Sequence, residues 1–483
     1  MLSSLFTRRT VARSTRANAG LRPSAEMLDA RILPSATATL SRGVLTVKGD
    51  VAAANNLTFE TINGGNGVRV TGTGGTLLNE DLTELDFAGV TSIKVITGAT
   101  SDSITIRAFD SLTVKNVTLS LGNGNNTVSI SDAVIEGKLA ITTGNGEDTI
   151  RVASIASFGT STSVTTLNGP VTINTGSGAD SIIIRCDTAF DSSTAFITLN
   201  GPLTINTGNG DDRVVFESFA AFDQAASTLT LNGIVKVTTG NDNDLIDVVA
   251  DGGFDSAFAD FDVNNHFTIN SGSGDDGISV RTADFLGGHG DLDFSRNLTI
   301  AAGNDDDEVW IGSSSSDIAI GGILRVTTGS GIDDLTVERV QQTSSVGSNS
   351  FSMGNDLDTV RIRASVFAAA TSTNLGSGNN NVLEISQAGF QGNASLISQG
   401  REDVLRIENT SSPYIGGTTF SGKVTVSAGP SASLLIGFDN SSPLTTFLGS
   451  VTLTGKSPFG TATFIDGRVV FTIPPVVKKF QLA

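Results

Sequence analysis

A short turn sequence that recurs along the chain constrains the fold more than any other feature. Each copy begins with a Gly at the end of a Thr- and Val-rich stretch, and successive copies are 22–32 residues apart. Self-similarity at such a period is typical of solenoids, in which each repeat forms one coil. The copies begin at Gly98, Gly122, Gly144, Gly176, Gly208, Gly240, Gly272, Gly303, Gly329, Gly354, Gly376 and Gly400, and continue more loosely at Gly429 and Gly455.

An acidic or amide residue follows each of these glycines at a fixed distance. It stands four residues after the Gly, or three in the copy that begins at Gly400, and a large apolar residue comes two positions later, as in Ile104, Ile182 and Val382. The repeated position holds Asp102, Asn126, Asp148, Asp180, Asp212, Asp244, Asp276, Asp307, Asp333, Asp358, Asn380 and Asp403. Stacked coils would place these side chains in one column along an edge of the solenoid.

The segments around each turn alternate between apolar and polar residues. Ile173 and Ile205 lie on the apolar side of their segments, and Thr172 and Thr204 on the polar side, which is the period of a half-buried strand. The 32-residue copies add a third segment that ends in Leu-Asn-Gly, as at 199–201, where Asn-Gly favours a sharp corner. We therefore predict an all-β fold, a right-handed parallel β-helix (β-solenoid) of about 12–14 coils with three strands per coil.

A Phe recurs fourteen residues after the anchor Gly in the longer copies, and one residue earlier in the last of them. The set is Phe158, Phe190, Phe222, Phe254 and Phe285. Stacked coils would bring these rings into one column that seals the longer corner, since Phe in register most often serves packing. An aromatic platform for sugars is the alternative.

Four segments follow from this pattern. We predict a disordered, basic leader at 1–39, N-terminal strands and a cap at 40–92, solenoid repeats at 93–455, and a C-terminal cap at 456–483. Residues 44–49 and 68–72 read as hairpin strands, and Arg468 to Ile473, stopped by Pro474 and Pro475, as the strand that closes the last coil. The leader contains no apolar run of the roughly 20 residues that span a bilayer.

Residues 27–35 of the leader read M-L-D-A-R-I-L-P-S. This string resembles a short L-[DE]-x-R-x-L-P-S element found near the N-terminus of many large exported bacterial repeat proteins. The resemblance implies export and an extracellular or cell-surface location. The net charge of −19 is against nucleic-acid binding, because an acidic surface repels phosphates. The single Cys186 rules out a disulfide within the chain and a Cys-based metal site.

The turn itself resembles the calcium-binding repeats-in-toxin nonapeptide G-G-x-G-x-D-x-U-x, in which U is a large apolar residue. Residues 207–214, T-G-N-G-D-D-R-V, match all but the first Gly. In that family Gly carbonyls and Asp carboxylates of successive turns enclose Ca²⁺. The resemblance implies a Ca²⁺ cofactor, with carbonyl ligands from Gly146, Gly178, Gly210 and Gly274. The carboxylate ligands it implies are Asp148, Asp180, Asp212 and Asp276. The acid-rich turns and the rest of the repeated position add Asp242, Asp244, Asp275, Asp305, Asp307, Asp333 and Asp358 as further candidate metal ligands.

Here, however, the motif occurs once per 22–32 residues instead of every nine, and Asn replaces Asp in two copies. Three explanations of a column of carboxylates remain open. The carboxylates bind cations, or they are protonated, or each accepts hydrogen bonds from the amides of its own corner.

The chain offers little for catalysis. His266 and His289 stand apart from any nucleophile, and no known catalytic or nucleotide-binding motif occurs. We therefore predict a non-enzymatic, secreted or cell-surface structural or adhesive β-solenoid of a bacterium, with a cell-envelope or matrix polysaccharide or protein as its partner.

The alternative is a polysaccharide-binding or polysaccharide-degrading (lyase or hydrolase) parallel β-helix. Its acidic loops, Asp251 to Asp262 and Asp291 to Asp293, would hold sugar or metal. A third interpretation is a flat Thr/Asn face such as ice-binding solenoids display, but Lys236 and Arg325 interrupt that face.

Overall fold

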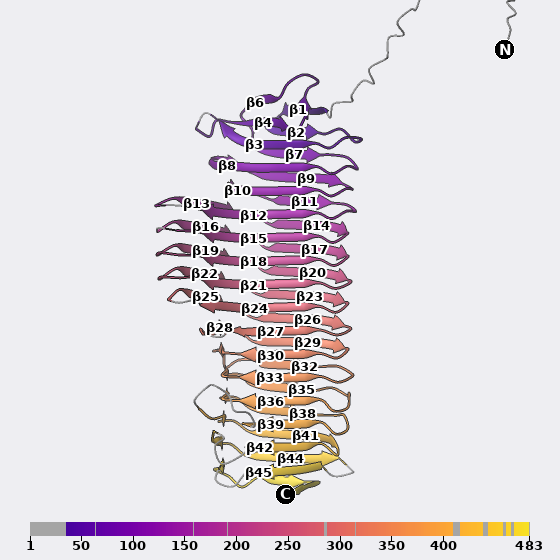
Figure 1. Ribbon diagram of the computed structural model, residues 1–483, viewed down its shortest axis with the longest axis vertical. Helices are drawn as coiled ribbons and strands as arrows, with labels where there is room; N and C mark the ends of the chain where they lie inside the picture. The colour runs from indigo at the N-terminus through magenta and orange to yellow at the C-terminus, as the bar shows by residue number, and fades with distance from the viewer. Residues whose placement is uncertain are drawn as a thin grey trace, which may run out of the picture.

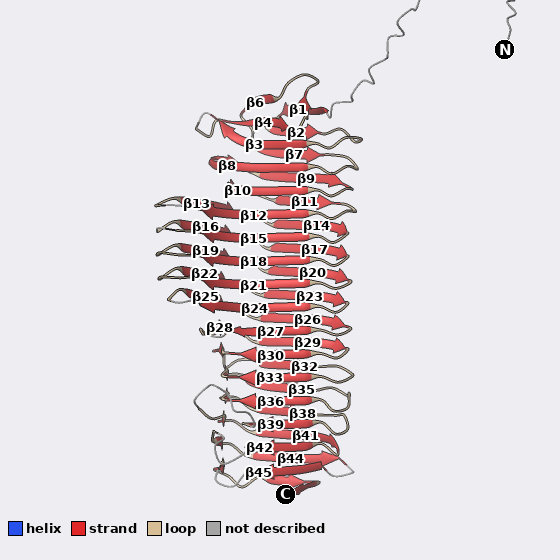
Figure 2. Cartoon of the chain, in the orientation of Figure 1, coloured by secondary structure: helices blue, strands red, loops and turns tan. Residues whose placement is uncertain are grey.

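The chain folds into one long rod of stacked β-coils (Figure 1). The computed structural model describes residues 35–482, apart from 63, 158, 191, 285–286, 314, 409–415, 438–442, 457–459 and 465–467. Residues 1–34 of the predicted leader lie outside the described residues. The prediction of disorder was wrong for residues 35–39, which belong to the first strand, Ser35–Ser41. Every regular element in the described part is a strand (Figure 2), and no helix there has the length and apolar character needed to cross a membrane. The all-β, parallel β-helical architecture is therefore as predicted.

Three sets of strands build the coils, and a group of antiparallel strands precedes them. The preceding strands are β1 (Ser35–Ser41), β2 (Val44–Lys48), β3 (Asn56–Ile62), β4 (Gly67–Thr73), β5 (Leu77–Leu78) and β6 (Glu84–Ala88). The strands before each Gly/Asp turn form the front sheet: β7 (Ser92–Ile96), β9 (Asn116–Gly122), β11 (Leu139–Thr143), β14 (Val171–Ser177), β17 (Leu203–Asn209), β20 (Val235–Asn241), β23 (Phe267–Ser273), β26 (Leu298–Asn304), β29 (Leu324–Ser330), β32 (Ser348–Ser352), β35 (Ala370–Asn374), β38 (Ala394–Ile397), β41 (Val424–Pro430), β44 (Val451–Lys456) and β47 (Val476–Lys478).

The strands after each turn form the back sheet: β8 (Ser103–Val114), β10 (Thr127–Ile135), β12 (Thr149–Ala156), β15 (Ser181–Thr188), β18 (Arg213–Ala220), β21 (Leu245–Gly252), β24 (Gly277–Asp284), β27 (Glu308–Ser313), β30 (Asp334–Glu338), β33 (Thr359–Arg363), β36 (Val382–Ser386), β39 (Val404–Ile407), β42 (Ser433–Ile436), β45 (Gly460–Phe464) and β48 (Phe480–Leu482). The third strands are β13 (Thr162–Leu167), β16 (Thr194–Leu199), β19 (Ala226–Leu231), β22 (Phe258–Val263), β25 (His289–Phe294), β28 (Ile318–Ile320), β31 (Val340–Gln342), β34 (Val366–Phe367), β37 (Gly389–Phe390), β40 (Thr419–Phe420), β43 (Thr445–Phe447) and β46 (Val469–Phe471).

The parallel register stacks equivalent residues of successive coils. Ile173 pairs with Ile205, which pairs with Val237, and each of these side chains is fully buried. The outward residues Thr172 and Thr204 pair in the same way. Because one coil covers the apolar face of the next, the core runs as one continuous cluster along the rod.

The N-terminal strands form hairpins, as the sequence predicts. β1 pairs antiparallel with β2, and β3 pairs antiparallel with β4, which in turn pairs with β6. β2 and β3 also pair in parallel with β7 and β8, so this cap is joined to the first coils. At the other end the prediction was wrong in one respect. β46 (Val469–Phe471) does not close the last coil, because the chain continues past Pro474 and Pro475 into β47 and β48.

In the longer coils the back strand runs beyond the body of the rod and the third strand returns beside it (Figure 1). The ends of β12, β15, β18, β21 and β24, the strands β13, β16, β19, β22 and β25, and the loops between them are called the fin. Its interior holds small side chains: the hydroxyls of Ser218 and Ser227 lie 2.8 Å apart, and Ala250 and Ala259 are buried. Small residues allow the two layers to approach closely, so the fin is a thin two-layered sheet.

The predicted column of Phe rings lies at the outer edge of the fin. Phe190 stacks on Phe222 at a centroid distance of 5.0 Å, and Phe222 on Phe254 at 5.2 Å, with nearly parallel rings. Phe158 and Phe285 lie outside the described residues. The rings cover one another's faces, which are the surfaces that a sugar would need, and this favours packing over a sugar platform.

Candidate functional site

The regular stacking of the coils places the repeated Asp residues at the turn between the front and back sheets. All eight candidates at the fourth turn position are buried, with exposed fractions of 0–3%: Asp148, Asp180, Asp212, Asp244, Asp276, Asp307, Asp333 and Asp358. Asp102 and Asp403, which are equally buried, extend this Asp column toward the two ends. A charged residue is rarely buried so completely unless it has a partner.

One oxygen of each carboxyl group is satisfied by the neighbouring coil. The backbone N–H of Asp180 donates to Oδ1 of Asp212 at 2.8 Å, and the N–H of Asp212 donates to Oδ1 of Asp244 at 2.9 Å. Hydrogen bonds from amides of the same corner were one of the predicted possibilities, but the observed donor is the amide of the preceding coil. The column thus joins each coil to the next.

The second oxygen of these carboxyl groups has no donor. Oδ2 is buried and without a hydrogen-bond partner in nine of them: Asp102, Asp148, Asp180, Asp212, Asp244, Asp276, Asp307, Asp333 and Asp358. The hydroxyl of Thr207 lies close enough to Asp212 to moderate its pKa, but it donates its single hydrogen to the carbonyl oxygen of Thr239 at 3.1 Å. At Asp403, by contrast, the hydroxyl of Ser398 donates to Oδ2. A buried carboxylate oxygen without a hydrogen-bond donor lowers the stability of the fold, so its occurrence in nine coils requires an explanation.

Three Asn residues occupy the same column and show what surrounds that second oxygen. Nδ2 of Asn126 donates to the carbonyl oxygens of Gly122 at 3.2 Å and Gly124 at 2.7 Å, both in its own turn. Nδ2 of Asn381 likewise donates to Leu375 O and Gly378 O, each at 2.9 Å.

Asn55, in the N-terminal cap, repeats the arrangement with the carbonyl oxygens of Asp50 and Ala53, each at 2.9 Å. Wherever the column holds Asn, therefore, two carbonyl oxygens converge on an N–H₂ group.

The prediction from the sequence missed one member of the column and assigned another to the wrong residue. Asn55 was missed because it precedes the first recognisable turn. The prediction of Asn380 was wrong: Asn381 is the buried residue, its Oδ1 accepts the amide of Asp358 at 2.7 Å, and Leu383 instead of Val382 points into the core. Asn380 instead lies in the turn with a φ of 64°. Three consecutive Asn residues, 379–381, gave no signal in the sequence to choose among them.

Burial makes the charged form of the column unfavourable. It raises the pKa of Asp180 to about 6, of Asp244 and Asp358 to about 7, and of Asp307 to about 8. The neighbouring carboxyl groups raise these pKa values further, and the donated amide lowers them. Two unit charges at the strand spacing of roughly 4.8 Å repel by about 3–4 kcal/mol at an effective dielectric constant of 20. Without a counter-charge, Asp244, Asp307 and Asp358 are therefore protonated in a substantial fraction of the molecules near neutral pH.

This predicts an unusual dependence of stability on pH for the protein without metal. Because the pKa values in the fold are raised above that of an unfolded Asp, the stabilisation is present at acidic pH. It is lost as the pH rises through the folded values of about 6 to 8. Each carboxyl that holds its proton only in the fold contributes a slope of about 1.4 kcal/mol per pH unit. Urea unfolding in EDTA between pH 5 and pH 9 measures this, and a free energy of unfolding that rises over that interval would contradict it.

The remaining three candidates lie outside the column. Asp242, Asp275 and Asp305 are exposed on the outer side of the turns. Asp242 and Asp305 take the place of a turn glycine and adopt a φ of 76°. Oδ1 of Asp275 accepts the amide of Asp306 in the next coil at 3.1 Å. The structure thus separates the eleven predicted ligands into eight that share one buried column and three that face solvent.

A glycine begins each turn because the coils approach closely there. Gly208 has a φ of 107°, and a Cβ at this position would lie 1.8 Å from the carbonyl oxygen of Gly176 in the preceding coil. No other residue fits this spacing. The backbones of successive turns therefore lie in close contact at these glycines.

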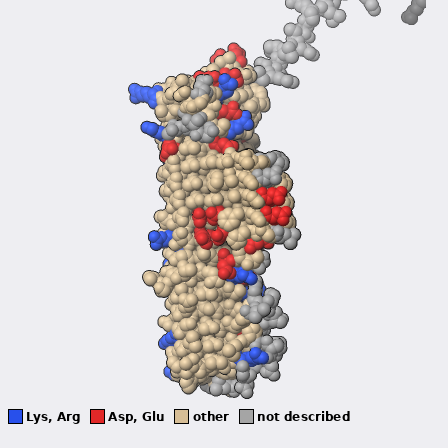
Figure 3. Space-filling model, turned by 90° about the vertical axis from the view of Figure 1, so that its left-hand side faces the viewer, with Lys and Arg blue, Asp and Glu red and all other residues tan. Residues whose placement is uncertain are grey.

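The fin carries a second group of acidic residues, and Figure 3 shows acidic side chains gathered over the middle of the rod. Asp260 and Asp262 of β22 pair with Asp291 and Asp293 of β25, and all four side chains face outward. Burial, followed by the other three carboxylates, raises the pKa of Asp260 to about 6. Among the described residues, no group of three or more His, Cys, Asp or Glu side chains is arranged to hold a metal ion. A metal site in this part of the chain would therefore need further oxygen ligands, such as backbone carbonyls or water.

The opposite face of the fin is mixed in charge. Arg185 pairs with Asp187 and with Glu217, at 3.2 Å in each case, and its guanidinium lies over the ring of Phe219. Its charge is thus already partnered and is not free for a substrate carboxylate, as a polysaccharide lyase would require.

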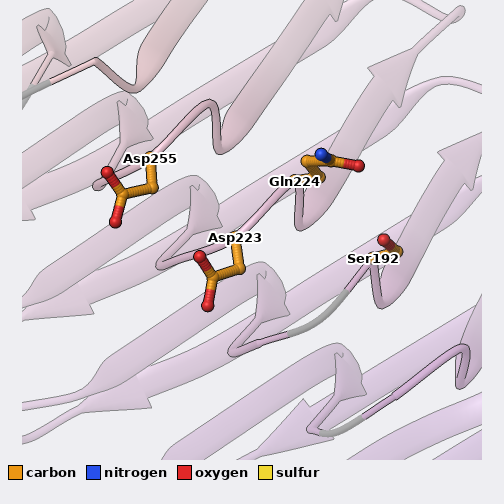
Figure 4. Close-up of a pocket in the computed structure, with 4 residues that line it drawn as sticks. All are labelled: Ser192, Asp223, Gln224 and Asp255. Atoms are coloured by element: carbon orange, nitrogen blue, oxygen red, sulfur yellow. The ribbon is translucent and has the colours of Figure 1, made fainter.

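A shallow pocket lies at the outer edge of the fin. Ser192, Asp223, Gln224 and Asp255 line it, and the two carboxylates project in the same direction from successive loops (Figure 4). None of the described residues that line this pocket is basic. The two histidines lie elsewhere on the surface: His289 is 3.8 Å from Asp284 and stacks on Phe258. Cys186 is buried in the fin, and burial raises the pKa of its thiol to about 12, so the thiol is inert.

These features define a parallel β-solenoid with a buried column of carboxyl groups. No family model matches the chain, and no curated protein matches it. A solved structure that is similar is a hyperactive, Ca²⁺-dependent, β-helical antifreeze protein from an Antarctic bacterium. It is 19% identical, the match covers 64% of this chain and 80% of that chain, and the TM-score is 0.32. At this identity and TM-score the likeness carries no conclusion about activity, and the Ca²⁺ dependence is a property of that protein.

Proposed function

We propose that the protein is a non-enzymatic structural or adhesive rod of the cell surface or the surrounding matrix, stabilised by Ca²⁺ bound along the Asp column. The observation that carries this proposal is the contrast between Asn and Asp within one column. The Asn residues supply an N–H₂ group to two carbonyl oxygens, whereas the equivalent oxygen of the Asp residues has no donor.

A cation resolves that contrast. Where Asp replaces Asn, a carboxylate oxygen stands at the place of the N–H₂ group, so the oxygens that converge there are all acceptors. A bound cation is attracted by each of them, whereas a proton serves only one pair. The residues that would hold the cation are the nine Asp residues with an unpartnered Oδ2, together with backbone carbonyl oxygens of the turns.

The chemistry of the available ligand atoms favours calcium among the common cations. Every available ligand is an oxygen, which suits hard cations, and the buried column contains no Cys or His for a transition metal. Ca²⁺ accepts six to eight oxygens in irregular geometry, including backbone carbonyls, whereas Mg²⁺ demands a near-ideal octahedron and retains water. A buried, water-poor column of carboxyl groups and carbonyls therefore fits Ca²⁺ better than Mg²⁺.

The same site supports a place outside the cell. Extracellular calcium modules operate at roughly 10⁻⁴ to 10⁻³ M Ca²⁺, a range in which a column of weak, repeated sites would fill. We expect the fully stable rod to form where Ca²⁺ is that abundant. The acidic outer face of the fin then favours a neutral or basic partner in the envelope or matrix, a polysaccharide or a protein, over nucleic acid.

Direct measurement of bound calcium tests the proposal. Equilibrium dialysis of the full chain at pH 7.5 should find several ions per molecule in millimolar Ca²⁺, up to about one per unpartnered carboxyl group. The variant Asp244→Asn should bind fewer ions, and the matched variant Asp211→Asn, on the outer side of the same turn, should bind as many as the parent. If the full chain bound no calcium at all, the proposed role of the column would be wrong.

A further inference from the structure

Among the described residues, the two ends of the rod cover the apolar core less completely than the body does. Along the body the inward side chains are buried, but at the N-terminal cap Leu85 and Phe87 are only partly buried against the core. At the other end the partly buried set is Phe464, Val469, Phe471, Val477 and Phe480. Val470, Ile473 and Val476 are 43–51% exposed there as well. Each end therefore lacks the neighbouring coil that covers the core elsewhere.

The same ends carry strands with one unpaired edge. Among the described residues, β6 pairs only with β4. Likewise, β46, β47 and β48 pair only with β43, β44 and β45. Figure 1 shows β6 at one end of the rod and β45, with the chain end, at the other. An unpaired edge presents a row of N–H and C=O groups to any strand that can align with it.

The direction of β6 matches that of the coils. β3 runs parallel to β8, β4 runs antiparallel to β3, and β6 runs antiparallel to β4. Two reversals restore the original direction, so β6 runs the same way as the back sheet. A back-sheet strand at the C-terminal end of another copy can therefore lie beside β6 in the parallel arrangement that every coil already uses.

The net charges of the two ends differ in sign. In the described part of the N-terminal cap, six acidic side chains outnumber the basic Arg42, Lys48 and Arg69. The N-terminal cap exposes Glu80, Asp81, Glu84 and Asp86, and of these only Asp86 and Glu84 contact Arg69, at 2.7 and 3.5 Å. At the other end Arg468, Lys478 and Lys479 are partly or fully exposed, and the described residues between 460 and 482 include no acidic residue. Two identical ends would repel each other, whereas unlike ends attract.

We propose that the C-terminal end of one rod docks on the N-terminal cap of a second copy of this chain, continuing the β-stack head to tail. The uncovered apolar residues become mutual neighbours, β6 continues the back sheet, and Lys478 and Lys479 meet the acidic cap. Because the contact joins two different surfaces along the rod axis, it does not close on itself, and the copies form linear filaments. This assembly does not depend on what fills the Asp column.

Sedimentation velocity of the full chain at low ionic strength, with electron microscopy of the same samples, tests the proposal. The parent protein should show a mass that grows with concentration and particles that lengthen without widening. Salt should reverse the growth, because it screens the charges. The double variant Lys478→Glu/Lys479→Glu should weaken association at least tenfold, and so should Glu80→Lys/Asp81→Lys. Mixing these two variants, whose unlike ends are again complementary, should restore elongation.

A matched control separates the ends from overall charge. The variant Lys236→Glu/Arg325→Glu changes the net charge as much as the first double variant does, but on the front sheet, and it should assemble like the parent. A full chain that remains monomeric at every concentration would overturn the proposal. So would end variants that assemble like the parent, or particles that widen by side-to-side contact.

Discussion

We expect removal of calcium to lower the midpoint of thermal unfolding steeply, and millimolar Ca²⁺ to raise it again. The reason is that a ligand which binds the fold and not the unfolded chain stabilises the fold by RT ln(1 + [L]/Kd), about 2.7 kcal/mol per site at one hundred times Kd. The column repeats one unpartnered carboxyl group through eight consecutive coils, from Asp148 to Asp358, so the effects of several sites combine. Circular dichroism of the full chain at pH 7.5, with excess EDTA and then with graded Ca²⁺, measures the midpoint.

Two controls sharpen this measurement. Mg²⁺ at the same concentration should raise the midpoint much less, since it retains its water and tolerates irregular ligands poorly. Repeating the series at pH 5 should reduce the effect of Ca²⁺, because protons then occupy carboxyl groups whose pKa values are about 6 to 8. A midpoint that is independent of Ca²⁺ at pH 7.5 would assign the column to protonated side chains and refute the calcium proposal.

The effect of the substitution Asp244→Asn on the free energy of unfolding should have opposite signs without and with calcium. In EDTA at pH 8 it removes a buried charge and supplies an N–H₂ group to the turn carbonyls, as Asn126 does. We expect stabilisation of roughly 1–3 kcal/mol, the cost of leaving a buried polar group unsatisfied. In saturating Ca²⁺ the same substitution removes a ligand, and it should destabilise the rod relative to the parent. Urea unfolding in both conditions gives the two free energies.

Asp211→Asn is the matched control for that prediction. Asp211 precedes a column residue, lies on the outer side of its turn, and accepts the amide of Asn243 at 3.1 Å, which an Asn side chain can also do. Its free energy of unfolding should change little in either condition. If Asp244→Asn shifted stability in the same direction with and without Ca²⁺, the carboxyl group would not be acting as a calcium ligand.

Much of the candidate site was predictable because its signals are local. The spacing of Gly and Asp predicted a column, and the structure places Asp102, Asp403 and the eight column candidates in it. The prediction failed where the local signal is ambiguous or absent, at Asn380 and Asn55. It also grouped Asp242, Asp275 and Asp305 with the column, because the sequence does not show which of the acidic residues within one turn points inward. In a tight turn that choice depends on one backbone φ angle.

In the fin, too, one packing contact was predictable from the sequence and another was not. The recurrence of Phe every 32 residues predicted a stack, and the rings of Phe190, Phe222 and Phe254 form one. No pattern in the sequence indicates that β18 and β19 meet through the hydroxyls of Ser218 and Ser227. Small polar residues in a strand have no preferred neighbour until the layer that covers them is in place.

The sequence by itself determined the coil: alternation with period 2 sets which side chains face inward, and the Gly/Asp turns set where the chain reverses, because both depend only on neighbouring residues. Only the tertiary structure decided what each carboxyl group contacts. Oδ1 of Asp212 accepts a hydrogen bond from the backbone amide of Asp180, which lies 32 residues earlier in the chain. That Oδ2 of Asp212 has no donor becomes visible only when the coils are stacked. Hydrogen bonds between coils depend on distances in space, and residues far apart in the chain acquire such distances only through folding.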